Sequence, residues 1–292
     1  MDFLQLQTQL RTQLLRLYDE REAGNIVEQL AEDYFNRRPP LAANIMLSDK
    51  ERQDFEEIAA RLLNGEPLQY VMGTACFYGY DFLLNRQTLI PRPETEELVY
   101  NIVQQVKRMP RPPRRYLEVG TGSGCIAIAL KKQLPDIEII AIDISEQALA
   151  IARQNAEIHG TDIDFRLIDF LDVSNWAAEF SPAYFDALVS NPPYILPIEQ
   201  ESRMSANTLF EPPAALFVTN KDAQQFYRLF ADFAPYLAPS ARLWCELNEF
   251  EAENTKAIFE ANPNWEALQI IDDIRRRPRV FCATKSATQR EG

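Results

Sequence analysis

A short segment in the second half of the chain holds residue types that could position a nitrogen atom for group transfer. Ser190-Asn191-Pro192-Pro193-Tyr194 ends a mostly apolar run, FDALVS, that is typical of a buried strand. Neither proline has an N–H, so the pair ends the strand and leaves backbone carbonyl oxygens free to accept hydrogen bonds. An amide or amino nitrogen could donate to the Asn191 side-chain oxygen and the Pro192 carbonyl, while Tyr194 holds the planar group. The segment therefore predicts a site for a nitrogen that accepts a methyl group; the alternative is a plain strand-end turn.

A glycine-rich loop supplies the strongest cofactor signal. Glu118-Val119-Gly120-Thr121-Gly122-Ser123-Gly124 lies between a predicted strand and a predicted helix. Glycines there let the backbone approach a ligand closely, at the sheet edge where open α/β folds bind ligands. The spacing is G-x-G-x-G rather than G-x-G-x-x-G, which favours an adenosyl group over a dinucleotide pyrophosphate. A tight turn without a ligand is the alternative.

Two acidic positions follow the next two predicted strands. Asp143 comes 19 residues after Gly124, where a carboxylate can accept both hydroxyls of a ribose, in NAD as well as in S-adenosylmethionine. Asp169 could accept from the exocyclic amine of adenine while Phe170 packs on the ring. Taken singly, a helix cap for Asp169 and a core position for Phe170 explain these residues equally well.

Composition limits the classes of partner. The 292 residues are 46% hydrophobic and 25% charged, which is enough for real cores, and no apolar run reaches the length of a membrane span. The net charge of −13 argues against binding mainly through a nucleic-acid backbone. Four scattered cysteines and one histidine, His159, predict neither a metal site nor a disulfide framework. We expect His159 to be a solvated residue at a helix end, and the protein to be cytoplasmic.

The pattern of apolar residues and turn residues changes twice along the chain. Residues 1–75 carry apolar positions at spacings of three or four and predict a small helical bundle. Residues 76–90, with aromatic residues near Gly79 and a turn at 85–87, predict a β-hairpin linker. Residues 91–292 alternate strand and helix signals, which predicts a mostly parallel, seven-stranded Rossmann-like sheet. The last two strands are joined by a link too short for a parallel crossover, so they should form an antiparallel hairpin at the edge.

From about residue 61 onward the chain resembles the PrmC/HemK family, the S-adenosylmethionine-dependent methyltransferases that modify the glutamine of the Gly-Gly-Gln motif in peptide chain release factors. NPPY alone also occurs in methyltransferases that act on adenine amino groups, and the combination with IPRPETE narrows the resemblance to this family. The matching segments are Gly65–Tyr70, Gly73, Phe77–Phe82, Leu89–Glu96, GTGSG, Asp143, NPPY and Phe210-Glu211-Pro212.

The resemblance implies a class I methyltransferase fold and a role for each matching residue. Gly120 through Gly124 would line S-adenosylmethionine, whose product is S-adenosylhomocysteine, with Asp143 at the ribose and Phe170 beside adenine. Asn191 through Tyr194 would bind the substrate glutamine. Arg92 and Glu94 would help close the site, unless they are only a surface ion pair. Glycines usual in the family are missing at 219–222 and 246–248, so the resemblance does not predict the details of those two loops.

Three functions compete at this stage. Release-factor glutamine methylation comes first, with the helical residues 1–75 as a substrate-recognition domain, a monomeric chain, and no direct contact with nucleic acid or membrane. An adenine-amino methyltransferase draws support from NPPY and from the basic clusters at 111–115 and 275–279, against the overall charge. A non-catalytic adenosyl- or dinucleotide-binding module would need only the glycine loop and Asp143, and leaves NPPY without a purpose.

Overall fold

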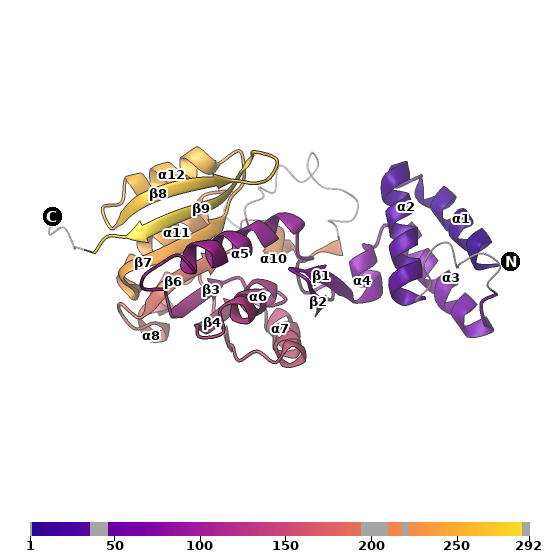
Figure 1. The fold of residues 1–292 in the computed structure, drawn as a ribbon, viewed down its shortest axis with the longest axis horizontal. Coiled ribbons are helices and arrows are strands. Elements are labelled where there is room, and N and C mark those ends of the chain that lie inside the picture. The colour runs from indigo at the N-terminus through magenta and orange to yellow at the C-terminus, as the bar shows by residue number, and fades with distance from the viewer. Residues whose placement is uncertain (1, 36–45, 194–209, 218–221, 288–292) are drawn as a thin grey trace. The chain divides into compact units, whose positions relative to one another are not determined.

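The computed structural model describes residues 2–35, 46–193, 210–217 and 222–287. These residues divide into two compact units (Figure 1): the first holds the residues up to Ala75 together with Phe210, and the second holds the rest. Among the described residues, no helix combines the length and the apolar character that crossing a membrane requires.

The first unit is helical, as the sequence predicts. Each of its three longer helices begins at a capping residue whose side chain accepts from a backbone N–H of the first turn, namely Asp2, Asp19 and Ser48. The apolar faces meet around Phe3, which contacts the rings of Phe35 and Phe55. The helices are α1 (Phe3–Leu14), α2 (Glu20–Gln29), the π-helical η1 (Leu30–Tyr34), α3 (Asp49–Leu63) and α4 (Leu68–Met72).

A two-stranded hairpin, β1 (Thr74–Phe77) and β2 (Tyr80–Leu83), follows the helical unit. Its turn is Tyr78-Gly79, and both residues have positive φ, 53° and 79°. Two consecutive positive φ values are typical of the tight turns that match the twist of a hairpin. The turn expected at 85–87 lies beyond the hairpin, where the Asn85 side chain accepts from the Gln87 N–H at 2.9 Å. The hairpin is therefore shorter than the predicted linker, and its turn is at Gly79.

The second unit contains the predicted seven-stranded sheet. Its order is β5-β4-β3-β6-β7-β9-β8, and every neighbouring pair is parallel except the two that involve β9. The expected antiparallel hairpin is present, with β9 inserted between β7 and β8. The strands are β3 (Arg115–Val119), β4 (Glu138–Asp143), β5 (Asp164–Leu167), β6 (Phe185–Ser190), β7 (Leu237–Glu246), β8 (Trp265–Asp272) and β9 (Pro278–Lys285).

Helices cover both faces of this sheet (Figure 1). One apolar cluster packs α5 (Pro93–Val106), α6 (Cys125–Gln133) and α7 (Glu146–His159) on one face. A second cluster, rich in aromatic residues, packs α8 (Trp176–Glu179), α11 (Gln225–Asp232) and α12 (Ala252–Glu260) on the other. The short elements are η2 (Val173–Asn175), α10 (Pro213–Leu216) and η5 (Ala234–Tyr236). Because helices cover both faces of the sheet, a ligand site is expected at the ends of the strands.

A buried asparagine on α7 ties the hairpin to the glycine loop. The side-chain oxygen of Asn155 accepts from the Leu83 N–H at 2.7 Å, and its nitrogen donates to the Leu83 carbonyl at 3.1 Å and to the Ser123 carbonyl at 2.9 Å. His159 lies at the end of the same helix, as expected, but it is only partly exposed and packs on Phe82 of the hairpin. The second strand of the hairpin is thus held within the second unit by polar and aromatic contacts.

We expect Asn155→Ala to destabilise the protein, because it removes the partner of the buried Ser123 carbonyl and of the partly buried backbone groups of Leu83. Each such group costs about 1–3 kcal/mol, so the free energy of unfolding measured in urea should fall by about 2 kcal/mol or more. The hairpin amides at 74–83 should also exchange faster with solvent. Gln154→Ala, at the exposed neighbouring position, is the control. An unchanged urea midpoint in Asn155→Ala would show that this anchor is not needed.

Candidate active site

A pocket of about 390 Å³ opens at the carboxyl ends of β3, β4, β5 and β6. Its wall includes Gly120 after β3, Asp143 at the end of β4, Phe170 after β5 and Asn191 after β6. Because parallel strands end at one edge of the sheet, four segments far apart in sequence meet here. The location is the one that the order of strands and motifs predicts.

The glycine loop closes onto β4 through its backbone. The N–H groups of Gly120 and Thr121 both donate to the Ile142 carbonyl, at 2.9 and 3.0 Å. The Gly122 N–H donates to Asp143 Oδ2 at 2.8 Å, and the Gly124 N–H donates to the Thr121 carbonyl at 2.9 Å. A loop that binds a pyrophosphate keeps its N–H groups for the ligand. Here four of them are already used, which favours a ligand without phosphate.

Only two of the five loop residues line the pocket. Gly120 has a φ of 74° and open space where a Cβ would stand, and Gly122 is the second lining residue. Thr121 and Ser123 are buried away from the pocket. A Cβ at Gly124 would lie 3.2 Å from side-chain atoms of Ala152 and Ile128, so this glycine allows α6 and α7 to pack closely. Gly120 and Gly122 are therefore placed to contact a ligand directly, and cofactor contact by the other three loop residues stays a prediction.

Glu118 is a buried carboxyl group behind the loop rather than a pocket residue. Its Oε2 accepts from the Thr121 hydroxyl at 2.6 Å, and its Oε1 has no hydrogen-bond partner among the described residues. Burial raises the pKa of Glu118 to about 8, against the smaller lowering effect of the Thr121 hydrogen bond. The group therefore keeps its proton at neutral pH and supports the loop as a neutral acid.

The charged residues that line the pocket are all acidic. Asp143 accepts from the Ser145 N–H at 2.9 Å with Oδ1 and from Gly122 with Oδ2, and burial raises its pKa. Asp169 also lines the pocket, where Oδ1 accepts from the Leu171 N–H at 2.9 Å. No Lys or Arg is among the described residues of its wall. Such a pocket suits a ligand with positive charge and hydroxyl groups, and it disfavours phosphate.

Phe170 touches the pocket but lies mainly in the core. The residue is 4% exposed, and its ring contacts Trp176, Phe230 and Phe233 at centroid distances of 4.8, 5.6 and 5.3 Å. Phe170 is therefore a core residue that also forms part of the pocket wall, and its packing against adenine stays a prediction.

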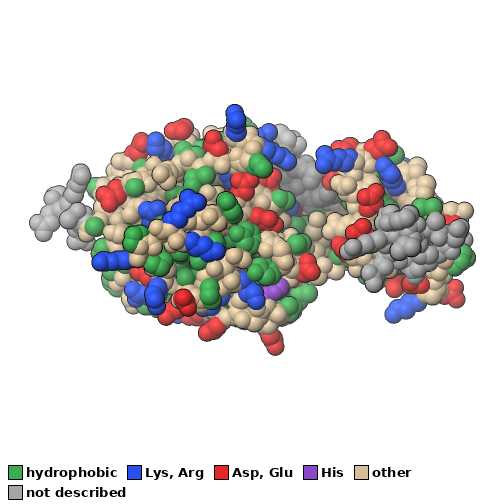
Figure 2. All heavy atoms as spheres, viewed as in Figure 1, with side chains coloured by type: hydrophobic (Ala, Val, Ile, Leu, Met, Phe, Trp, Pro, Cys, Tyr) green, Lys and Arg blue, Asp and Glu red, His purple; other side chains and the backbone are tan. Residues whose placement is uncertain are grey.

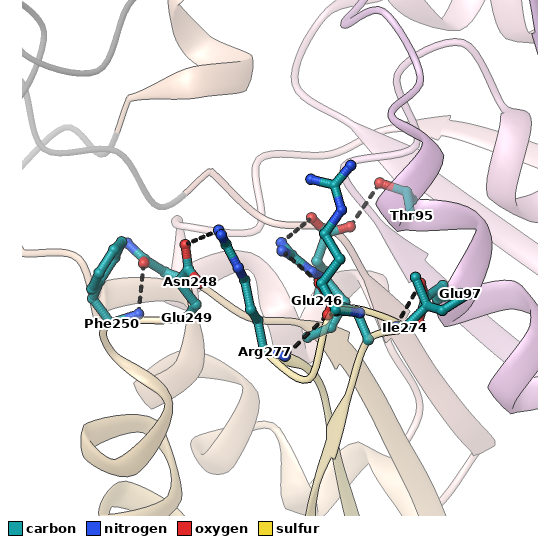
Figure 3. A network of polar contacts seen from close by, with 11 residues as sticks. Thr95, Glu97, Glu246, Asn248, Glu249, Phe250, Ile274 and Arg277 are labelled. Carbon is teal, nitrogen blue, oxygen red and sulfur yellow. Dashed lines mark hydrogen bonds and ion pairs between the residues drawn. The ribbon is translucent and has the colours of Figure 1, made fainter.

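Asn191, Pro192 and Pro193 line the pocket, while Tyr194 lies outside the described residues. The Asn191 side-chain nitrogen donates to Thr95 Oγ1 at 3.1 Å, and the Thr95 hydroxyl donates to Glu246 Oε2 at 2.7 Å. Figure 3 shows Thr95 on α5 pointing to Glu246. Sequence reasoning missed both partners, although Thr95 lies inside the IPRPETE motif.

Arg92 acts on the pocket through another segment. Its Nη2 donates to Glu211 Oε1 at 2.6 Å, and Glu211 is buried, so the pair is not a surface ion pair between Arg92 and Glu94. Pro212 and Pro213, next to Glu211, line the pocket. Among the described lining residues neither Arg92 nor Glu94 is found. Arg92 therefore holds one wall in place, and no contact supports a role for Glu94.

The fold and the pocket together define a class I methyltransferase. Residues 100–220 match the methyltransferase small domain, and residues 6–73 match the PrmC N-terminal domain. A 16S rRNA N2 G1207 methyltransferase from T. thermophilus, solved with AdoMet and guanosine, superposes with a TM-score of 0.51 at 16% identity. The match covers 73% of this chain and 49% of that chain, and it shows the fold alone.

Sequence relatives narrow the class to one family. A release factor glutamine methyltransferase of Bacteroides thetaiotaomicron is 40% identical over 247 residues, covering 84% of this chain and 85% of the relative. Another of the same name, from Flavobacterium psychrophilum, is 34% identical over 279 residues, covering 94% and 96%. The chain belongs to the release factor glutamine methyltransferase family, as the motifs predict.

We expect Glu118→Gln to change how stability depends on pH. Between about pH 4.5 and about 8 the folded protein keeps a proton on Glu118 that the unfolded chain releases. The free energy of unfolding therefore falls as pH rises through this window, by up to about 1.4 kcal/mol per pH unit. The amide does not titrate, so the variant should lack this loss of stability. Its urea midpoint should therefore rise relative to that of the parent between pH 5 and pH 8. Parallel pH profiles would contradict the buried, protonated acid.

Proposed function

We propose that this protein transfers a methyl group from S-adenosylmethionine to the side-chain amide nitrogen of the glutamine in the Gly-Gly-Gln motif of peptide chain release factors. The observation that carries the proposal is the position of Asn191 in the same pocket as Gly120 and Asp143. Membership in a family whose named relatives are release factor glutamine methyltransferases supports the choice of substrate.

The pocket fits the cofactor by its chemistry. Asp143 would hold the ribose, Asp169 and the edge of Phe170 would face the adenine, and Gly120 and Gly122 would let the backbone come close. The acidic wall matches a ligand with a positive sulfonium and an ammonium group. When bound, S-adenosylmethionine supplies an electrophilic methyl group.

The residues after β6 would orient the accepting nitrogen. An amide nitrogen is a poor nucleophile because its lone pair is delocalised, so alignment contributes more than early deprotonation. The Asn191 side-chain oxygen and the Pro192 carbonyl would accept its two hydrogens and fix its plane. Positive charge would grow on this nitrogen as it takes the methyl group, and acceptors already aimed at its hydrogens would stabilise that charge. One of these protons would then leave the nitrogen and restore a neutral amide. We also propose that Tyr194 holds the amide plane, as the NPPY motif suggests.

The competing functions fit the structure less well. Acidic and basic side chains are interspersed on the face of the second unit in Figure 2, without a continuous basic surface for a nucleic-acid backbone. The occupied N–H groups of the glycine loop leave little for a dinucleotide pyrophosphate. We propose a monomer that acts on a protein and makes no direct contact with nucleic acid.

The decisive test is a methyl-transfer assay that offers a release factor and adenine-containing DNA side by side, with mass spectrometry of the glutamine. Asn191→Ala should lower kcat by at least about 100-fold, because alignment and charge stabilisation are both lost. Its dissociation constant for S-adenosylhomocysteine should stay within about twofold, since Asn191 is assigned to the substrate. Methylation of DNA but not of the glutamine would sink the proposal.

Asp143→Ala is the matched control for cofactor binding. Loss of its hydrogen bonds to a ribose should weaken S-adenosylhomocysteine binding by about tenfold or more, as measured by calorimetry. An unchanged dissociation constant would show that Asp143 does not bind the cofactor.

We further propose that the helical first unit binds the release factor outside the glutamine. A chain that begins at residue 76 should then bind S-adenosylhomocysteine like the whole protein, while its KM for the release factor rises by about tenfold or more. Circular dichroism and the cofactor titration report whether the shortened chain is folded. Equal KM values for the two chains would count against a recognition role.

A further inference from the structure

Three polar side chains form a directed chain from β7 through α5 to the pocket. Glu246 ends β7 and Thr95 lies in the first turn of α5, and both are 2% exposed. The links are 2.7 Å from Thr95 to Glu246 and 3.1 Å from Asn191 to Thr95. Arg279 lies beyond, with Nη1 3.8 Å from the other oxygen of Glu246.

The direction of each hydrogen bond in this chain follows from which atom carries a proton. The Thr95 hydroxyl donates to Glu246 Oε2, which accepts as a carboxyl oxygen. The single hydroxyl proton of Thr95 is therefore used toward Glu246. The Thr95 oxygen can then only accept, so the Asn191 atom that faces it must be the amide nitrogen.

The bond to Thr95 also sets the direction of the Asn191 side-chain oxygen. With its nitrogen held by Thr95, the side-chain oxygen of Asn191 points away from Thr95. If the amide were flipped, the pocket would present a donor to the N–H groups of the substrate, which are donors as well. The orientation of one amide thus decides whether the site accepts or repels the substrate nitrogen.

We propose that Thr95 is a positioning residue that sets the Asn191 amide with its oxygen toward the substrate, and that Glu246 acts on Asn191 through it. The inference rests on the proposed function, because it assigns the oxygen of Asn191 to the glutamine nitrogen. A purely structural alternative is that the bond between Thr95 and Glu246 only joins α5 to β7. The two differ in what happens to Asn191 itself.

The first measurement follows the Asn191 side-chain amide directly. Protein labelled with ¹⁵N-asparagine gives one resonance pair for Asn191, assigned by its loss in Asn191→Asp. In Thr95→Val this pair should move upfield and exchange faster with water, and in Thr95→Ser it should stay near its original position. Unchanged resonances in Thr95→Val would overturn the proposal without any assay of methyl transfer.

The second measurement separates positioning from stability. Thr95→Val should lower kcat for release-factor methylation by about tenfold or more, with the S-adenosylhomocysteine dissociation constant and the KM for the release factor within about twofold. Thr95→Ser should restore kcat to within about threefold, because it keeps the hydroxyl. Thr255→Val is the matched control: Thr255 is also buried, and its hydroxyl donates to the Gln224 side chain at 2.9 Å.

The outcomes distinguish the two claims. A kcat in Thr95→Val within about twofold of the parent, or an equal loss in Thr255→Val, would overturn the positioning role. Should Thr95→Val fail to fold, Thr95→Ala takes its place against Thr95→Ser in both measurements. If the parent protein transfers no methyl group to a release factor, the proposed function fails, while the amide resonances still decide whether Thr95 orients Asn191.

Discussion

The parallel pairing of β3 with β4 and with β6 is the constraint on which the site depends. Val119 pairs with Ile142 on one side and with Ser190 on the other, so these strands end in step. The pairing of Ser190 with Cys245 extends the same row to β7. The residues that directly follow these four paired residues are Gly120, Asp143, Asn191 and Glu246. A slip of one residue in any pair would turn a functional side chain to the other face of the sheet.

Electrostatics then selects what this row of residues can bind. The chain carries a net charge of −13, and the described wall of the pocket adds carboxylates without a cation. Such a field attracts a positively charged cofactor and repels phosphate groups. The same field favours a reaction in which positive charge develops on an amide nitrogen, because the acceptors around that nitrogen are in place before the charge appears. Burial modifies the field locally, since it keeps Glu118 protonated behind the loop.

The sequence predicts the parts of this arrangement that local chemistry decides. Alternating strand and helix patterns, the glycine loop and the paired prolines each follow from neighbouring residues, and the fold and the pocket edge are as expected. Contacts between distant residues could not be predicted in this way: Thr95 meets Glu246 across 151 residues, and Arg92 meets Glu211 across 119. The spacing of the glycines in the sequence also does not show that Gly120 lines the pocket while Gly124 allows two helices to pack closely.

The loop after β7 forms a defined turn without a glycine. The resemblance leads us to expect a glycine within 246–248, and a positive φ is one condition that would require it. None of these three residues has positive φ. Instead the Asn248 side chain accepts from the Phe250 N–H at 3.1 Å, a turn in which the side chain replaces a backbone carbonyl. Because Asn248 is buried directly after Glu246 and Leu247, this turn fixes the chain where it leaves β7. The turn thus helps to fix the position of Glu246, on which the proposed orientation of Asn191 depends.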